Sequence, residues 1–227
     1  ARVQWQNYAT VWMNEEASML RAFANTLYIA LFSIIGQMFI SSLAAYSFAK
    51  INFKGKQVVF MLFLSSMMVP SQLTIIPRFM LFKTIGLYNN LWAIILPAFF
   101  GATSIFMLRQ FYMGLPNDLI EAAKIDGAGH LRIFLRIMLP LTKAALMSLI
   151  ILAFISSWNE YMAPLIFLVK KELYTVSQNI QWYMLDEFKE HNLTMAAATS
   201  AIVPVVILFI VGQKYFVEGI ATSGVKG

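Results

Sequence analysis

The sequence predicts an all-α, polytopic membrane protein with five transmembrane helices in this chain. Of its 227 residues, 59% are hydrophobic and only 12% are charged, whereas about a quarter of the residues of an ordinary soluble domain carry charge. Five apolar runs have roughly the length of about 20 residues that a helix needs to cross a bilayer. Because no internal repeat or low-complexity linker divides the runs, residues 1–227 are expected to form a single transmembrane domain.

The apolar runs follow one another along the whole chain, at residues 22–49, 58–76, 91–108, 141 to beyond 158, and 195–211. Small residues cluster in the first run and allow helices to approach closely in lipid: Gly36, Ser41, Ser42, Ala44 and Ala45. Prolines interrupt the later runs, and such breaks are tolerated where protein or a water-filled cavity satisfies the freed backbone groups: Pro70, Pro97, Pro164 and Pro204.

Basic residues indicate the orientation of the chain. With five spans, ten lysines and arginines fall on the side of residues 109–143 and seven fall on the other side. Since cytoplasmic loops carry the excess of positive charge, the segment 109–143 and the C-terminus are expected in the cytoplasm. The chain starts at Ala1 without a signal-peptide pattern, so we expect either processing or an upstream segment.

The segment of about residues 110–140 is far more polar than its neighbours. Asp118 and Glu121 have the spacing of a capping box, which predicts a short helix that ends near Ile125. Asp126 and Gly127 then form a turn signal, with Asp126 placed to cap the next helix. Asp126 is therefore interpreted as a helix cap, whereas Glu121 can serve both as a cap and as a contact to a partner.

A second short helix is predicted from His130, and Pro140 separates it from the fourth apolar run. Its apolar residues recur at helical spacing on one face: Leu131, Phe134, Leu135 and Met138. Two short helices joined at a glycine suit insertion into a groove on another protein. They equally suit a position among lipid headgroups, and shape alone leaves the two interpretations level.

The loop also resembles a known motif. The spacing E-A-A, three residues, G, nine residues, I, one residue, L-P is filled by Glu121, Ala122, Ala123, Gly127, Ile137, Leu139 and Pro140. With average residue usage, the chance of such a match in this chain is on the order of one in a million. The segment is similar to the EAA loop of permease subunits of ATP-binding-cassette (ABC) importers. That resemblance implies paired cytoplasmic coupling helices that dock on an ATPase.

Three further segments resemble carbohydrate-uptake permeases similar to the smaller permease of the maltose importer. They are WNEY at residues 158–161, SSLAAYSFAKINFKGK from Ser41, and the ending GIATSGVKG. The resemblance implies that the tail contacts the ATPases through Gly224, Val225, Lys226 and Gly227. It also implies six helices in the intact protein, the first of which would precede this chain.

The resemblance implies a bacterial cytoplasmic (inner) membrane protein that imports sugars or oligosaccharides by alternating access. Its partners would be a second permease subunit in a heterodimer, two ATPase subunits, an extracytoplasmic solute-binding protein and membrane lipid, without nucleic acid. The chain has no phosphate-binding G-x-x-x-x-G-K-[ST] loop, so it is not expected to be an enzyme, and ATP and Mg would bind the partners. Cysteine is absent and the two histidines are far apart, so no metal is expected.

The alternatives are an ion-coupled secondary transporter and a non-transporting scaffold. A proton relay usually needs several ionisable groups within the membrane, and only Glu160 is a candidate. Candidates for the substrate path are Trp158, Asn159, Glu160 and Tyr161, which join aromatic faces with hydrogen-bonding groups. The opposing interpretation is a helix break that packs on the second permease. Other polar groups remain open as path residues: Gln37, Tyr46, Ser65, Ser66, Gln72 and Thr74.

Residues 170–192 form the longest outer segment between two runs. Trp182 and Tyr183 are candidates for aromatic anchors at the membrane interface. The resemblance instead implies contact with the solute-binding protein in this region. The sequence favours neither interpretation over the other.

Overall fold

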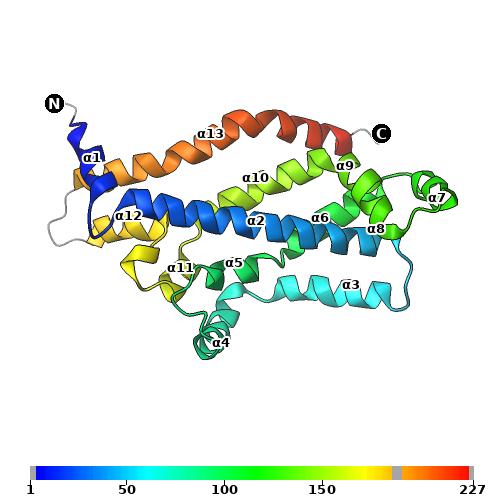
Figure 1. The fold of residues 1–227 in the computed structure, drawn as a ribbon, viewed down its shortest axis with the longest axis horizontal. Helices are drawn as coiled ribbons and strands as arrows, with labels where there is room; N and C mark the ends of the chain where they lie inside the picture. Colours follow the sequence, from blue (N-terminus) through cyan, green and yellow to red (C-terminus); the bar gives the residue numbers. More distant parts are fainter. Residues whose placement is uncertain (1–3, 186–190, 225–227) are drawn as a thin grey trace. The chain divides into compact units, whose positions relative to one another are not determined.

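The computed structural model describes the backbone of residues 4–185 and 191–224, and side chains as far as residue 213. Every regular element in these ranges is a helix, which agrees with the predicted all-α class (Figure 1). The helices, in chain order, are α1 (Gln6–Met13), α2 (Met19–Lys50), α3 (Lys56–Ser65), η1 (Ser66–Met68), α4 (Ser71–Thr84), α5 (Trp92–Ala98), α6 (Ala102–Met113), α7 (Asp118–Ile125), α8 (His130–Ile133), η2 (Phe134–Met138), α9 (Leu139–Leu141), α10 (Lys143–Asn159), α11 (Met162–Phe167), η3 (Lys171–Leu173), α12 (Val176–Leu185) and α13 (His191–Gly224).

Within the described ranges, three helices are long and apolar enough to cross a membrane: Met19–Lys50, Trp92–Met113 and His191–Gln213. Two further candidates are bent pairs, Lys56–Met68 with Ser71–Thr84 and His130–Leu141 with Lys143–Asn159. The structure therefore has three to five candidate spans. They correspond in order to the five runs predicted from the sequence, and the polytopic helical class is confirmed.

The second predicted run is not one straight helix. Its two halves meet at a bend of 95°, and Val69 between them has extended backbone angles of φ −82° and ψ 112°. A residue that precedes a proline is driven out of the helical region by the proline ring. Pro70 therefore accounts for the break, and the helix restarts at Ser71.

Contacts divide the chain into two compact units. The first comprises residues 1–33, 74–97 and 152–211, and the second comprises residues 34–73, 98–151 and 212–227. Five helices contribute residues to both units: α2, α4, α5, α10 and α13.

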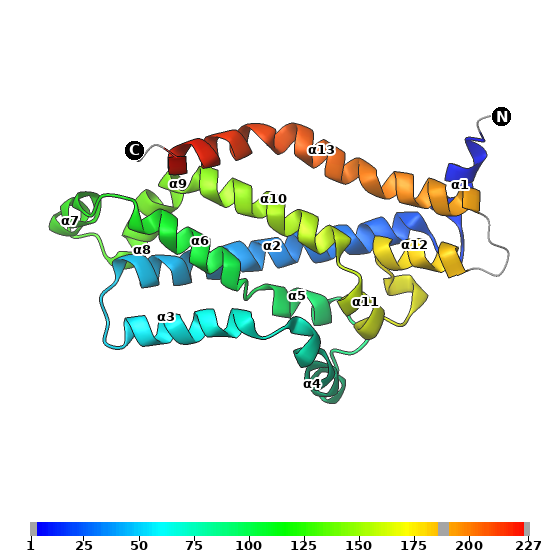
Figure 2. The ribbon, with the colours of Figure 1, turned by 180° about the vertical axis from the view of Figure 1, so that it is seen from behind.

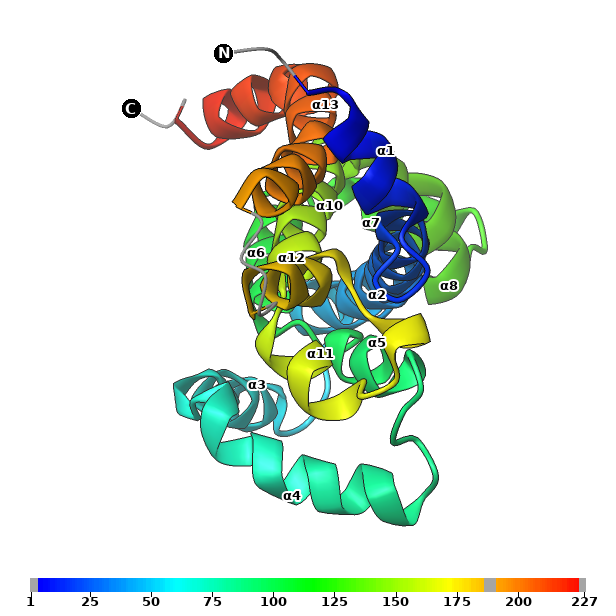
Figure 3. The same ribbon diagram turned by 90° about the vertical axis from the view of Figure 1, so that its left-hand side faces the viewer.

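The core of the first unit joins α1, the start of α2, α12 and the start of α13. Its buried members are mostly aliphatic and aromatic: Val11, Ala17, Met19, Ala22, Trp158, Val176, Tyr183, Ala196 and Ala197. The Trp12 indole nitrogen donates to Ser200 Oγ at 3.1 Å, which links α1 to α13. The backbone nitrogen of Val176 donates to Thr26 Oγ1 at 2.9 Å, which places α12 beside α2 (Figure 3).

In the second unit, α2 packs closely on the interruption between α5 and α6 (Figure 2). A Cβ atom built on Gly36 would lie 2.2 Å from the Phe99 ring, and one built on Gly101 would lie 2.1 Å from the Gln37 side chain. The Gln37 amide also donates to Ser104 Oγ at 3.0 Å. Gly36, one of the small residues predicted to allow close approach, therefore lets Phe99 of the same chain pack against α2.

Candidate functional site

The loop between α6 and α10 begins with α7, whose bounds match the predicted short helix. The predicted capping box is wrong, because the N-cap is Asn117 and Asp118 is already the first helical residue. Asp118 and Glu121 instead lie in the first turn, where carboxylates complement the positive end of the helix dipole. Ala123 is buried while Glu121 and Ala122 are exposed. The Glu-Ala-Ala triplet thus divides between the protein interior and the surface.

The end of α7 depends on Gly127, which has φ +76°. The Gly127 nitrogen donates to Lys124 O at 3.0 Å, and the Ala128 nitrogen donates to Ala123 O at 2.9 Å. This pair of bonds is the Schellman motif, in which a residue in the left-handed region closes a helix. The predicted turn glycine is confirmed. Asp126 is the C-cap of α7 and not a cap of α8, whose N-cap is Gly129.

The helix after Gly129 does not keep the predicted apolar face. Phe134 and Met138 are buried, but Leu131 and Leu135 are 66% and 48% exposed, and Ile133 takes their place inside. The physical reason is the π-helical turn η2, in which residues five apart fall on one side, as Ile133 and Met138 do. A wider turn here also accommodates Pro140, which has no N–H for the carbonyl four residues earlier.

The loop ends in a bend of 76° between α9 and α10. Thr142 lies at this bend, with its hydroxyl bonded to Met138 O at 3.1 Å and to Leu139 O at 2.9 Å. Of the remaining motif residues, Ile137 and Leu139 are half-buried and Pro140 is exposed. Pro140 lies just before the bend, close to the predicted separation of this helix from the next span.

The WNEY segment lies in the first unit, at the end of α10. Trp158 is only 2% exposed. Its indole nitrogen donates to Ala201 O at 3.0 Å, and its ring stacks on Phe154 at 5.4 Å and meets the edge of Phe23 at 5.3 Å. The Trp158 side chain therefore belongs to the core of this chain.

The next three residues are more accessible. Asn159 is exposed and its amide donates to Ile155 O at 2.8 Å. Glu160 Oε1 accepts from the Ala163 nitrogen at 3.0 Å and so caps the start of α11. Helical geometry is lost at Tyr161, with φ −122° and ψ −42°. Assignment of these residues to the substrate path stays a prediction.

The other polar candidates make short-range or structural bonds. The Tyr46 hydroxyl lies 3.1 Å from His130 Nδ1, and Gln37 bonds to Ser104. Ser65 and Ser66 donate to carbonyl oxygens of their own helix. Gln72 and Thr74 are exposed.

The outer segment folds as η3 and α12 up to Leu185, and residues 186–190 lie outside the described chain. Tyr183 is not an interfacial anchor, because it is 3% exposed and its hydroxyl donates to Ala17 O at 3.0 Å. Trp182 is half-buried, with Lys171 Nζ 5.6 Å from its ring centroid. A tyrosine whose partner lies 166 residues earlier cannot be assigned to the interior from local sequence.

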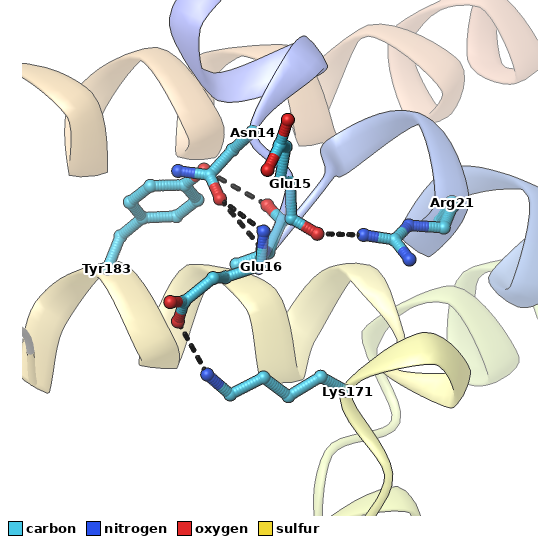
Figure 4. A network of polar contacts seen from close by, with 7 residues as sticks. Asn14, Glu15, Glu16, Arg21, Lys171 and Tyr183 are labelled. Carbon is cyan, nitrogen blue, oxygen red and sulfur yellow. Dashed lines mark hydrogen bonds and ion pairs between the residues drawn. The ribbon is translucent and has the colours of Figure 1, made fainter.

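Figure 4 shows how the turn before α2 is held against α12. Asn14 Oδ1 accepts from the backbone nitrogens of Glu16 and Ala17, both at 2.9 Å. Lys171 Nζ lies 2.6 Å from Glu16 Oε2, in the one salt bridge found among the described residues. The hydrogen bond from Lys171 lowers the pKa of Glu16, and the same bond raises the pKa of Lys171.

The predicted ATPase-contacting tail falls largely outside the described chain. Gly224 is the last residue of α13, and Val225, Lys226 and Gly227 are not described. Among the described residues, no group of three or more histidine, cysteine, aspartate or glutamate side chains could hold a metal ion.

The chain matches a family model described as binding-protein-dependent transport system inner membrane component, over residues 37–222. It is 35% identical over 225 residues to the arabinooligosaccharides transport system permease protein AraQ of Bacillus subtilis, which covers 99% of this chain and 80% of AraQ. The chain belongs to this permease family. It is an inner membrane, multi-pass permease subunit of an ABC transporter and is not itself catalytic.

Two other relatives extend this result. The melibiose/raffinose/stachyose import permease protein MelC of Bacillus subtilis is 32% identical over 230 residues, which cover 100% of this chain and 83% of MelC. A crystal structure of a bacterial ABC transporter involved in the import of the acidic polysaccharide alginate has a TM-score of 0.85 and 24% identity. It covers 95% of this chain and 81% of that one, and shows the shared fold. The predicted resemblance to carbohydrate-uptake permeases is confirmed.

Proposed function

We propose that this permease subunit moves sugars or oligosaccharides across the inner membrane by alternating access, and that α7 to α9 form its docking surface for a cytoplasmic ATPase. The observation that carries the docking assignment is the exposure of large apolar side chains on α7, which lies outside every candidate span. Ile125 is 87% exposed and Leu119 is 40% exposed. Outside lipid, exposed apolar side chains suit a protein partner.

Charge favours a protein partner over lipid headgroups. From Asp118 to Leu141 the loop carries three acidic and three basic residues, so its formal charges cancel. Helices that lie among headgroups are instead rich in lysine and arginine on their polar face. An exposed surface with both signs of charge around apolar anchors suits a groove on a folded protein.

The loop and the C-terminus are placed on the cytoplasmic side in this proposal, because ATP is cytoplasmic. The ATPase pair would bind ATP and Mg. Gly224 and the three residues that follow it would contact the ATPases. A second permease and an extracytoplasmic solute-binding protein would complete the importer. The proposal rests on the family membership and on the excess of basic residues on the loop side.

Oligosaccharides are proposed as the substrate class because AraQ and MelC are named for them. Asn159 and Tyr161 would meet the sugar, while Trp158 and Glu160 would hold the local backbone. The exposed Asn159 amide and the break in the helix at Tyr161 support this division. A proton-coupled mechanism through Glu160 is less favoured, because its carboxylate already caps α11.

The deciding experiment is uptake by the complete importer in proteoliposomes. ATP is enclosed with the ATPase domains, and arabinotriose, raffinose and an alginate oligosaccharide are offered outside with the solute-binding protein. Uptake should follow ATP hydrolysis and persist when an ionophore collapses the proton gradient. Uptake that stops with the ionophore would indicate a secondary transporter. Binding of the ATPases without uptake of any of the three sugars would count against the proposed substrate class.

A further inference from the structure

The last turns of α2 contact the start of the first loop helix, α7, and its connection from α6. Lys50 Nζ donates to Leu115 O and to Asn117 Oδ1, both at 2.7 Å. Asn117 is the N-cap of α7. Because the donor is charged, such bonds are roughly twice as strong as neutral ones. Lys50 therefore fixes the position where the docking loop begins.

One helical turn earlier, Tyr46 holds the second loop helix. Its side chain is 3% exposed, and its hydroxyl lies 3.1 Å from Nδ1 of His130, the first residue of α8. Its ring centroid is 5.5 Å from that of Phe134 in η2 and 6.2 Å from that of Tyr112 in α6. Residues four apart share a helix face, so Tyr46 and Lys50 form one attachment surface on α2.

The same end of α2 is itself braced by cations. Arg109 Nε donates to Phe48 O at 3.3 Å, with its guanidinium carbon 4.1 Å from the Phe60 ring centroid. Lys56 Nζ donates to Ile51 O at 2.9 Å. Positive groups at a helix C-terminus satisfy its last carbonyl oxygens and complement its dipole. The residues of the attachment surface and the cations that brace this end of α2 all belong to the second unit.

We infer that Tyr46 and Lys50 are positioning residues that make α2 the element through which the docking loop moves the membrane helices. The loop and the second-unit part of α2 then move as one body when the ATPases close. This inference rests on the proposed docking function of the loop. The docking function alone does not say which membrane helix follows the loop. Here α2 is that helix, and Tyr46 and Lys50 hold the loop to it.

The test measures the spacing between α2 and the loop in the purified importer complex. Because the chain has no cysteine, one pair of spin labels can be introduced through Phe39→Cys in α2 and Arg132→Cys in α8. The distance distribution is recorded without nucleotide and after trapping with ATP and orthovanadate. The same labels are then measured in Tyr46→Phe, which keeps the ring packing, and in Tyr46→Phe with Lys50→Met.

The wild-type distribution should be unchanged by trapping. A second population should grow by about fivefold in Tyr46→Phe and by more than tenfold in the double variant, since bonds to a charged donor are stronger than neutral ones. Matched controls are Tyr28→Phe, also in α2, and the exposed Lys54→Met, and both should leave the distribution unaltered. A wild-type spacing that changes on trapping, or variant spacings equal to wild type, would overturn the inference.

Failure of the proposed docking function has a different signature. If the ATPases do not co-purify with the wild-type permease, the docking function is refuted, while the spacing in the variants still reports the attachment. If the ATPases co-purify with every variant but the spacing never changes, docking stands and the role of Tyr46 and Lys50 is refuted. The two results are therefore read from separate measurements.

Discussion

Gly127 allows a sharp test of the loop's geometry, because Gly129, two residues later, provides a matched control position. Gly127 has φ +76°, whereas Gly129 has φ −73°. A Cβ atom at either position would meet no described atom within 4 Å. The same substitution to serine at each site therefore differs in backbone strain and not in crowding. A left-handed conformation costs an L-residue about 1–2 kcal/mol.

That strain acts on the two bonds that close α7. In Gly127→Ser the population of the open turn should rise by roughly 5-fold to 30-fold. The assay is hydrogen exchange of the Ala128 amide, which is bonded to Ala123 O, together with co-purification of the ATPases. Gly129→Ser should keep the wild-type exchange rate of the Ala128 amide and the wild-type co-purification of the ATPases, because serine is a favoured N-cap. Equal exchange and equal ATPase binding in the two variants would refute the assigned role of the turn.

Three further predictions concern other parts of the chain. Asn159→Ala should weaken uptake in a normally assembled complex by about 0.5–1.5 kcal/mol, measured as a change in uptake kinetics, and unchanged kinetics would remove Asn159 from the path. Glu16→Gln should lower the melting temperature at neutral pH by breaking its bond to Lys171; since that bond holds the pKa of Glu16 below its usual range, the difference from wild type should disappear as the pH falls through that lowered pKa. Gly36→Ala should destabilise the permease by about 1–3 kcal/mol in chemical unfolding, because its Cβ would lie 2.2 Å from the Phe99 ring, and a stability equal to wild type would show that the ring moves freely.

The loop shows which features local sequence can predict. The bounds of α7 and the turn at Gly127 follow from spacing and from the backbone that glycine permits. The apolar face of the next helix was mis-phased, because a period of 3.6 residues was assumed where a π-helical turn begins at Phe134. Pro140 is the sequence signal that could have indicated this irregularity.

Contacts between distant residues lay beyond sequence reasoning. Lys50 reads as one more basic residue near the end of a span, and only the fold brings it to Asn117, 67 residues later. The sequence leaves Tyr46 open as a path residue, whereas the structure places its hydroxyl next to His130. The composition, the five runs and the resemblance predicted the class and the family, since these depend on patterns along the chain.

Crosslinking from Ile125 reports whether the loop from α7 to α9 contacts the ATPase. The chain has no cysteine, so Ile125→Cys gives it a single thiol for a photoactivatable reagent. Leu62→Cys, 67% exposed in the span that begins at Lys56, is the matched control. We predict a crosslinked product with the ATPase from Ile125→Cys and none from Leu62→Cys. Labelling of Ile125→Cys by lipid or solvent alone, in a complex that retains the ATPases, would contradict the account.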